Sequence, residues 1–94
     1  MHERMREVAL TVYGRSECHL CEEMTEIVRA VAAELGCTLA VVDISEDAEL
    51  EARFGQEVPV LCVNGRKAFK YRLTERDLRK RVRAERRGVE TPGA

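Results

Sequence analysis

The sequence predicts an α/β domain in which a mixed four-stranded sheet is flanked by three helices, in the order β-α-β-α-β-β-α. Three observations predict it. Strand-forming residues precede a long amphipathic helix, a second apolar run of strand length follows that helix, and an Asn-Gly pair separates two further strand-like runs. The first β-α-β unit is expected to be parallel and right-handed, whereas the Asn-Gly turn adds an antiparallel pair.

The first half of the chain alternates between strand and helix patterns. Residues 8–13 are rich in strand formers and end at Gly14, which predicts a buried first strand. After a polar loop, apolar residues recur at the three- and four-residue steps of a helix, for which Gly36 is a suitable C-terminal cap. Residues 39–42 form a second apolar run, which Asp43 closes. The apolar positions of the helix are Leu20, Met24, Ile27, Val28, Val31 and Leu35.

A short acidic helix and a hairpin follow. Ser45 or Asp47 is expected to cap this helix, and Gly55 is expected to end it. Leu50 and Phe54 form its apolar side. Two strand-like runs then flank the Asn-Gly pair, which is the strongest short-range signal for a hairpin.

The two runs of this hairpin, residues 58–63 and 66–71, lead into the last helix. Thr74 is expected to be its N-cap, because Asp77 stands at the position of a capping-box acid. The helix is expected to stop at Gly88.

The chain has 94 residues, of which 45% are hydrophobic and 35% charged, so it can build one core and is typical of an ordinary soluble domain. Residues 1–88 are assigned to this domain and residues 89–94 to a flexible C-terminal tail. No apolar run is long enough for a membrane span or a signal peptide, so a cytoplasmic location without membrane contact is expected. In that compartment the four cysteines favour redox catalysis or metal binding over a disulfide framework.

Charge is divided unevenly along the chain. Residues 1–65 carry 13 acidic and 5 basic side chains, whereas residues 66–87 carry 3 acidic and 11 basic ones. A basic segment of this kind attracts phosphate, nucleic acid or an acidic protein. Because no aromatic residue interleaves with the basic ones after Tyr71, a solvated helix face is the favoured interpretation, and no nucleic acid partner is expected.

Cys18 and Cys21 lie at the junction between the first strand and the long helix. Their spacing places them on one helical face, about 5–6 Å apart, which is compatible with a disulfide. Unpaired amides and the positive end of the dipole at a helix start stabilise a thiolate, so Cys18 is the expected nucleophile, with a lowered pKa. Cys21 is expected to resolve the mixed disulfide. His19 either tunes the thiolate or fills an exposed spacer position.

A Cys-X-X-Cys pair is also half of a zinc site, but such sites usually need a second closely spaced pair of ligands. Cys37 and Cys62 are isolated from each other in the sequence. They are therefore interpreted as small buried residues on strand positions, and no metal site is expected.

The segment Tyr13-Gly14-Arg15-Ser16-Glu17-Cys18-His19-Leu20-Cys21 is followed some 37 residues later by Val58-Pro59, which Arg53-Phe54-Gly55 precedes. This combination resembles the glutaredoxin branch of the thioredoxin superfamily over nearly the whole chain, and within it the glutaredoxin-like group. The resemblance implies a thioredoxin-like fold. It also implies that Pro59 follows a cis peptide bond and packs beside the active cysteines, and that Val58 pairs through its backbone with bound peptide or glutathione.

Two departures from the glutaredoxin pattern concern glutathione. His19-Leu20 stands where glutaredoxins commonly have Pro-Tyr, and Tyr71-Arg72-Leu73-Thr74 stands where many have a Gly-Gly pair that admits the γ-glutamyl end of glutathione. Arg15 and Arg53 are candidate cations for a glutathione carboxylate, and the helix start at Thr74 is a candidate for another. A role as solvated surface is equally compatible with both arginines. Glutathione stays open as a co-substrate, and no bound cofactor is expected.

The function that these residues favour is thiol-disulfide exchange on protein disulfides or glutathione mixed disulfides. The expected protein is a monomer that glutathione or a thioredoxin reductase recycles. Two other classes stay open. A metal or iron-sulfur carrier would use Cys18 with an external thiol, and a non-catalytic thioredoxin-like module would dock through its basic last helix.

Overall fold

The computed structural model describes residues 7–88 and confirms both the α/β class and the expected order of elements. The flexible tail assigned to residues 89–94 lies outside the described residues. The elements are β1 (Ala9–Gly14), α1 (His19–Leu35), β2 (Thr38–Asp43), a single 3₁₀ turn η1 (Ile44–Glu46), α2 (Ala48–Phe54), β3 (Val60–Val63), β4 (Arg66–Lys70) and α3 (Glu75–Arg86). The turn η1 is the one element among them that the sequence pattern did not predict.

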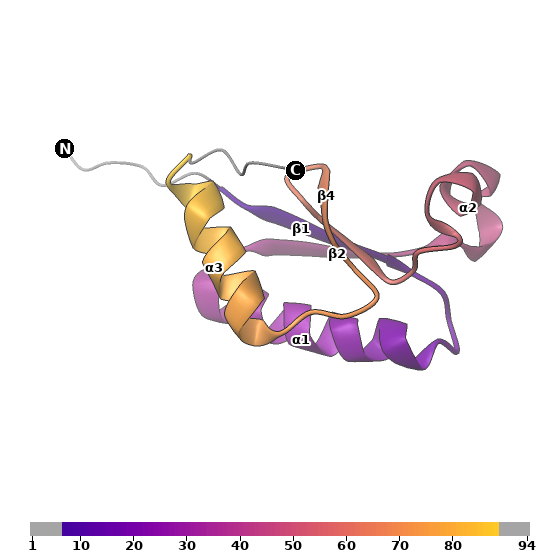
Figure 1. Cartoon of the computed structure of the whole chain (residues 1–94), viewed down its shortest axis with the longest axis horizontal. Coiled ribbons are helices and arrows are strands. Elements are labelled where there is room, and N and C mark those ends of the chain that lie inside the picture. The colour runs from indigo at the N-terminus through magenta and orange to yellow at the C-terminus, as the bar shows by residue number, and fades with distance from the viewer. Residues whose placement is uncertain (1–6, 89–94) are drawn as a thin grey trace.

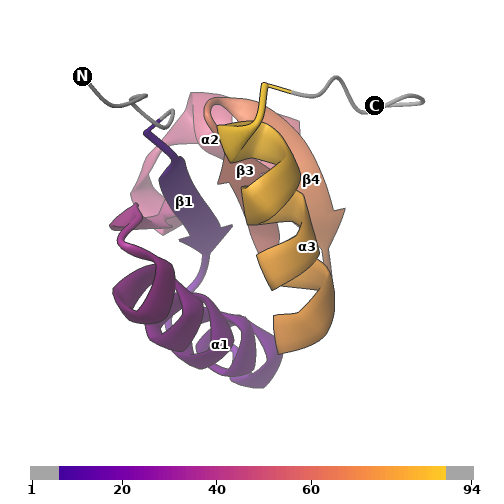
Figure 2. The ribbon, with the colours of Figure 1, turned by 90° about the vertical axis from the view of Figure 1, so that its left-hand side faces the viewer.

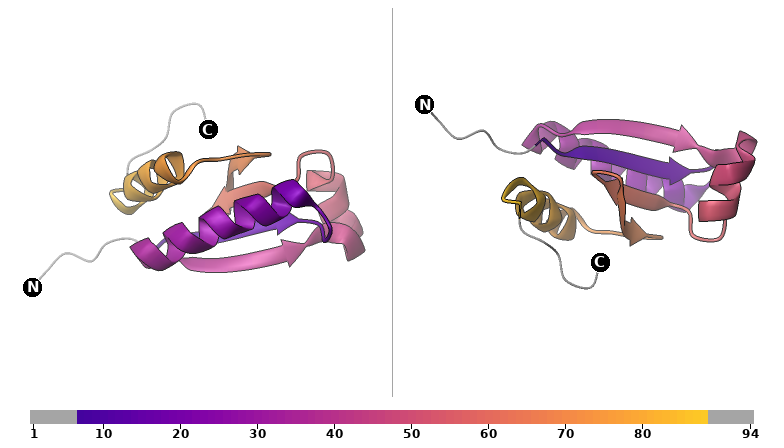
Figure 3. Two further views of the ribbon diagram at one scale, coloured as in Figure 1. Left: turned by 90° about the horizontal axis from the view of Figure 1, so that it is seen from below. Right: turned by 90° about the horizontal axis from the view of Figure 1, so that it is seen from above.

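The four strands form a mixed sheet in the order β2-β1-β3-β4. β1 pairs with β2 in parallel and with β3 in antiparallel fashion, and β3 and β4 form the expected antiparallel hairpin. α1 and α3 lie together on one face of the sheet (Figures 1 and 2). α2 lies at the end of the sheet where β1 and β2 finish (Figure 3). The end of β1 that leads into α1 is therefore next to α2.

Side chains of β1 alternate between two hydrophobic clusters, as expected for a strand covered on both faces. Leu10 and Val12 belong to the main cluster beneath α1 and α3. Tyr13 points the other way, and its ring stacks on Phe54 of α2 with the centroids 4.5 Å apart. α2 is thus anchored close to the point where β1 ends. The main cluster comprises Val8, Leu10, Val12, Met24, Val28, Val31, Ala32, Leu61, Val63, Leu78 and Val82.

β2 is an edge strand, and it is well exposed despite its apolar sequence. Leu39 and Val42 are half-buried, and Val41 is 52% exposed. Apolar surface is therefore present at this edge of the sheet.

The ends of the helices follow the predicted caps with one distinction. Asp47, rather than Ser45, caps α2, because its Oδ1 accepts the backbone N–H groups of Glu49 (3.0 Å) and Leu50 (3.1 Å). Ser45 lies inside η1 instead. Gly36 caps α1 with a φ of 73°, a left-handed conformation that glycine adopts without strain. The predicted cap of α3 is confirmed, since Oγ1 of Thr74 accepts the N–H of Asp77 (3.1 Å).

The Asn64-Gly65 turn does more than reverse the chain. Both residues have positive φ values, 49° and 84°, as a two-residue hairpin requires. The Asn64 side chain accepts the N–H of Ala9 (2.8 Å) and donates to the Glu85 carboxylate (3.0 Å), which is 5% exposed. A second partner, Arg66, lies 3.5 Å from this buried carboxylate. The last turn of α3 is thereby tied to the hairpin and to the start of β1.

The interpretation of the two remaining cysteines is confirmed for Cys62 and wrong for Cys37. Cys62 is buried within β3. Cys37 is half-buried and lies in the turn between α1 and β2, where its N–H donates to the carbonyl of Ala32 (2.9 Å). The left-handed cap at Gly36 leaves one residue to complete the turn before β2 begins, and Cys37 is that residue.

Candidate active site

Cys18 and Cys21 are joined by a disulfide at the start of α1, with their Cα atoms 5.2 Å apart. Cys18 is the N-cap of the helix, and its Sγ accepts the backbone N–H of Cys21 at 3.2 Å. The two sulfurs are not equivalent, because Cys18 is partly exposed whereas Cys21 is only 5% exposed. The outer cysteine is therefore the one that a substrate can reach.

Gly14, the last residue of β1, makes room for the inner cysteine. A β-carbon at this position would lie 3.0 Å from both Cβ and Sγ of Cys21, closer than such atoms ordinarily approach. The absence of a side chain at Gly14 lets the first turn of α1 pack directly on the end of β1. This close approach explains how Cys21 is buried only three residues after an exposed loop.

His19 occupies an exposed position between the two cysteines. Its side chain is 83% exposed, and its Nε2 lies 2.9 Å from a carboxylate oxygen of Glu23, one helical turn further on. The sequence left open whether His19 tunes the thiolate or fills an exposed spacer position, and its exposure agrees with the spacer position.

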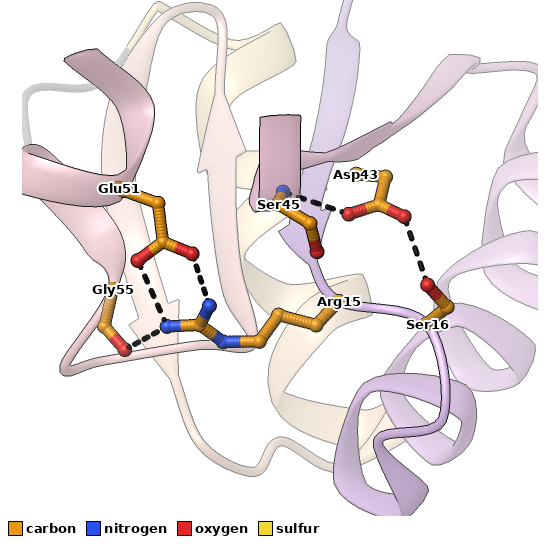
Figure 4. Close-up of polar contacts among 6 residues, drawn as sticks. All are labelled: Arg15, Ser16, Asp43, Ser45, Glu51 and Gly55. Carbon is orange, nitrogen blue, oxygen red and sulfur yellow. Dashed lines mark hydrogen bonds and ion pairs between the residues drawn. The ribbon is translucent and has the colours of Figure 1, made fainter. Parts of the chain in front are cut away.

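Arg15 connects the loop before Cys18 to the C-terminal end of α2 (Figure 4). Both of its Nη atoms donate to the Glu51 carboxylate, and Nη2 also donates to the carbonyl oxygen of Gly55 (2.8 Å). This contact leaves no room for a side chain at Gly55. A β-carbon there would lie 2.5 Å from the carbonyl oxygen of Glu51 and 3.2 Å from Nη2 of Arg15. The guanidinium of Arg15 is thus engaged within the protein.

A second polar contact joins the same loop to the end of β2 (Figure 4). The Ser16 hydroxyl donates to Oδ2 of Asp43 (3.0 Å), and Oδ1 of Asp43 accepts the backbone N–H of Ser45 (2.9 Å). Hydrogen bonds from Ser45, and then from Ser16, lower the pKa of the Asp43 carboxyl below its usual range. The carboxylate is consequently ionised at neutral pH and holds the loop against η1.

The other residues singled out in the sequence lie around this centre in different roles. The Val58-Pro59 peptide bond is cis, as the resemblance implied, and the Pro59 carbonyl accepts the N–H of Tyr71 (2.8 Å). The guanidinium of Arg53 lies 4.7 Å from the centre of the Phe54 ring. Thr74 uses its hydroxyl to cap α3.

Two pockets flank α1. The first, of about 330 Å³, lies between α1 and β2, and we refer to it as the β2-side pocket. Cys21, Arg15 and Ser16 contribute to its wall. The second, of about 400 Å³, lies between α1 and the segment before α3, where Thr74 and Tyr71 are among its lining residues. The structure thus brings Cys21 and Arg15 together in one pocket and places Thr74 in the other.

Cys37 and Cys62 differ from the pair in their chemistry. Burial raises the pKa of both thiols above the ordinary value, and nearby cations only partly oppose it: Arg86 beside Cys37, and Arg53 and Lys67 near Cys62. A raised pKa leaves little thiolate at neutral pH, so these cysteines are poor nucleophiles.

Residues 7–88 contain neither a cluster of metal-ligating side chains nor a membrane-spanning helix. No group of three or more histidine, cysteine, aspartate or glutamate side chains in this range is arranged to hold a metal ion. None of the helices in the same range is long and apolar enough to cross a membrane.

Residues 9–83 match the family described as the glutaredoxin-like domain (DUF836). The chain belongs to this family. The match begins with β1 and ends within α3, so it includes the cysteine pair and the whole sheet. No curated protein matches the sequence of this glutaredoxin-like domain.

Solved structures of other proteins are similar to this chain over most of its length. Protein XcR50 from X. campestris is 34% identical, with 80% of this chain and 96% of that chain covered and a TM-score of 0.68. Protein Ne2328 from Nitrosomonas europaea is 29% identical, with 86% and 98% covered and a TM-score of 0.72. Thioredoxin from Fasciola hepatica is 19% identical, with 82% and 79% covered and a TM-score of 0.56, which shows the fold alone. The glutaredoxin-like domain therefore has a thioredoxin-like fold.

Sequence patterns did not reveal the partners of residues 15–17, the loop before Cys18, which we refer to as the active-site loop. Glu51 and Asp43 are acidic residues among many in this chain, and their only sequence signals were a helix face and the end of a strand. Both partners come from segments at least 27 residues away from the loop residues they contact. Contacts over such separations follow from the packing of α2 and η1, which no local pattern encodes.

Proposed function

We propose that this glutaredoxin-like domain is a thiol-disulfide oxidoreductase in which Cys18 is the nucleophile and Cys21 the resolving thiol. The observation that supports it most is the asymmetry of the two sulfurs at the start of α1: the N-cap is partly exposed, and the cysteine one turn later is buried. A two-step exchange needs an outer sulfur that meets the substrate and an inner sulfur that meets only the outer one.

In the reduced protein, the amides of the first turn and the helix dipole favour the Cys18 thiolate. This thiolate attacks one sulfur of the substrate disulfide, forms a bond to it, and releases the other substrate sulfur as a thiolate. Cys21 then gives its proton to water and attacks Sγ of Cys18, which releases the second substrate thiolate and forms the Cys18–Cys21 disulfide. Two electrons pass from the protein to the substrate, and an external thiol has to return them.

The proposed substrates are protein disulfides or glutathione mixed disulfides, and the proposed reductant is glutathione or a thioredoxin reductase. Glutathione takes part as a co-substrate and not as a bound cofactor. Because Arg15 is engaged by Glu51, the groups proposed to bind the glutathione carboxylates are the guanidinium of Arg53 and the N-terminal end of α3 at Thr74. We propose that the protein acts as a monomer in the cytoplasm.

The test is the reduction of insulin and of a small aromatic disulfide, with glutathione or a thioredoxin reductase as the electron source. The wild-type protein is expected to accelerate reduction, Cys18→Ser to abolish the acceleration, and Cys37→Ser, the matched control, to retain it. A wild-type protein without activity, or a fully active Cys18→Ser variant, would contradict the proposal. A purified protein that is inactive but coloured or loaded with zinc would favour a metal or iron-sulfur carrier.

Mass spectrometry of Cys21→Ser separates the two classes of substrate. Without the resolving thiol, a substrate attacked by Cys18 stays attached to it. After exposure to oxidised glutathione and to cell extract, glutathione on Cys18 would indicate glutaredoxin-type chemistry, whereas trapped proteins alone would indicate thioredoxin-type chemistry. The absence of both adducts would count against an oxidoreductase.

A further inference from the structure

The β2-side pocket lies directly against the redox centre. Cys21 forms part of its wall, and the sulfur of Cys21 is bonded to that of Cys18. We propose that this pocket binds a lysine or arginine side chain of a polypeptide substrate, next to the cysteine whose disulfide is exchanged. The inference rests on the oxidoreductase function proposed above and adds the substrate class that the site selects, namely basic polypeptide disulfides.

The shape of the pocket suits one long side chain attached to an extended backbone. Its volume of about 330 Å³ is at the small end of ligand pockets. One wall is β2, an edge strand whose outer backbone groups are unpaired within the sheet, and an extended polypeptide adds readily to such an edge. The backbone of a substrate bound to Cys18 can therefore pair with the edge of β2 beside the pocket.

The wall offers apolar surface for the stem of that side chain. Val12 and Val41 both line the pocket, and Val41 is 52% exposed, although it belongs to a regular strand. Lysine and arginine carry three or four methylene groups that pack along apolar surface while the charged head stays at a polar rim. The exposed Val41 side chain, in the wall of the same pocket as Cys21, fits this use.

Three carboxylate side chains line the pocket. Glu22, the residue after Cys21, and Asp43, at the end of β2, both line the pocket, and Glu26 follows one helical turn later. Asp43 is fixed in place by Ser16 and Ser45, whose hydrogen bonds lower its pKa and keep it ionised. A cationic head group would meet fixed negative charge without any rearrangement of the loop.

The two arginines of the pocket wall, Arg15 and Arg29, do not cancel the negative charge of Glu22 and Asp43. Arg15 is bound by Glu51 and by the carbonyl of Gly55. Arg29 is seven residues after Glu22 on α1, which places it about 10 Å further along the helix axis. A cation near Cys21 is therefore favoured. An anion such as oxidised glutathione, which carries a net negative charge at neutral pH, is disfavoured there.

The test compares two peptides of identical length that contain one cysteine flanked by lysine in the first and by glutamate in the second. Each cysteine is converted to a mixed disulfide with thionitrobenzoate, whose release reports the rate of reaction with the reduced protein. The lysine peptide is expected to react about four- to ninefold faster at low ionic strength, since two exposed ion pairs contribute about two- to threefold each. The difference is expected to fall below about twofold in about 0.5 M salt.

Variants separate the pocket from the general charge of the protein. Glu22→Gln and Asp43→Asn are each expected to reduce the preference for the lysine peptide about two- to threefold. Glu23→Gln is the matched control, because it removes the same charge one residue along the helix, in the wall of the other pocket. Glu22→Gln is the decisive variant, since the Glu22 side chain makes no hydrogen bond or ion pair with residues 7–88 that its loss would disturb. Thermal unfolding verifies that the variant is folded.

Three results would overturn the inference, and they are distinguishable. Equal rates for the two peptides, or equal effects of Glu22→Gln and Glu23→Gln, would overturn the pocket while the oxidoreductase function stands. Failure of the protein to reduce either peptide and also a neutral small disulfide would overturn the function itself, and this inference with it.

Discussion

The sulfur of Cys18 accepts the backbone N–H of Cys21 at 3.2 Å, so the outer cysteine of the pair is also the N-cap of α1. This position is usually filled by an oxygen of serine, threonine, aspartate or asparagine. Hydrogen bonds to an ionised acceptor are stronger than those to a neutral one, so the same N–H stabilises the thiolate more than the thiol. The start of the helix and the proposed chemistry therefore depend on one group.

Loss of Arg15 is expected to weaken the attachment of α2 to the active-site loop. Arg15→Ala removes the paired hydrogen bonds to Glu51 and the bond to Gly55, and is expected to lower the free energy of unfolding by about 1–2 kcal/mol. Urea denaturation measures the change, and Arg29→Ala, at an exposed arginine of α1, is the control, with a change within about 0.5 kcal/mol. If Arg15→Ala and Glu51→Ala add without coupling in a double-mutant cycle, the contact does not stabilise the fold.

Gly55 is expected to tolerate no side chain. A β-carbon there would lie 2.5 Å from the carbonyl oxygen of Glu51 and 2.7 Å from its carboxylate, so Gly55→Ala has to displace α2 or the contact with Arg15. We expect a loss of about 1–3 kcal/mol in the free energy of unfolding, as for other overpacked sites. Gln56→Ala, at the exposed neighbouring position, is the control. Unchanged stability of Gly55→Ala would show that this contact is absent in solution.

Cys37 and Cys62 are expected to react slowly with alkylating agents. Their burial raises their pKa values, so the thiolate fraction at pH 7 is below that of an ordinary cysteine and increases only as the pH rises. A limiting amount of iodoacetamide added to the reduced protein at pH 7, followed by peptide mass spectrometry, gives the order of modification. Modification of Cys62 before Cys18 would contradict the assignment of roles.

Asp43 is expected to make stability depend on acid pH. Its pKa is lower in the folded protein than the value of about 3.9 in an unfolded chain, so its contribution is fully present above that value. The contribution is lost as the pH falls through the lower folded value, because the unfolded chain then binds the proton more readily. Urea midpoints measured from pH 6 down to pH 2 are expected to fall less steeply for Asp43→Asn than for wild type. Parallel curves would argue against the Ser16 and Ser45 contacts.

Local sequence signals predicted the parts of the fold that local interactions determine. The Asn64-Gly65 turn, the cap at Thr74 and the position of Cys18 at a helix start depend on residues within a few positions of each other, and the structure confirms them. The cis peptide bond before Pro59 followed from family resemblance alone, since most bonds of this type are trans.

Features that depend on distant segments could not be predicted in this way. The apolar composition of β2 does not reveal that it is an edge strand, because that depends on which strands β1 pairs with. The sequence left Arg15 open between a cation for a glutathione carboxylate and a solvated surface residue. Its pairing with Glu51 follows from the position of α2, which no local pattern predicts. The turn at Cys37 depends on where α1 ends relative to the sheet.

The pH dependence of Cys18 alkylation tests the central proposal most directly. With the reduced protein, the rate of carboxamidomethylation of Cys18, followed by mass spectrometry from pH 4 to pH 10, gives the pKa of this thiol. The position of Cys18 at the N-terminus of α1 predicts a midpoint clearly below the ordinary value of about 8.5. A midpoint at or above that value would contradict the account of Cys18 as an activated nucleophile.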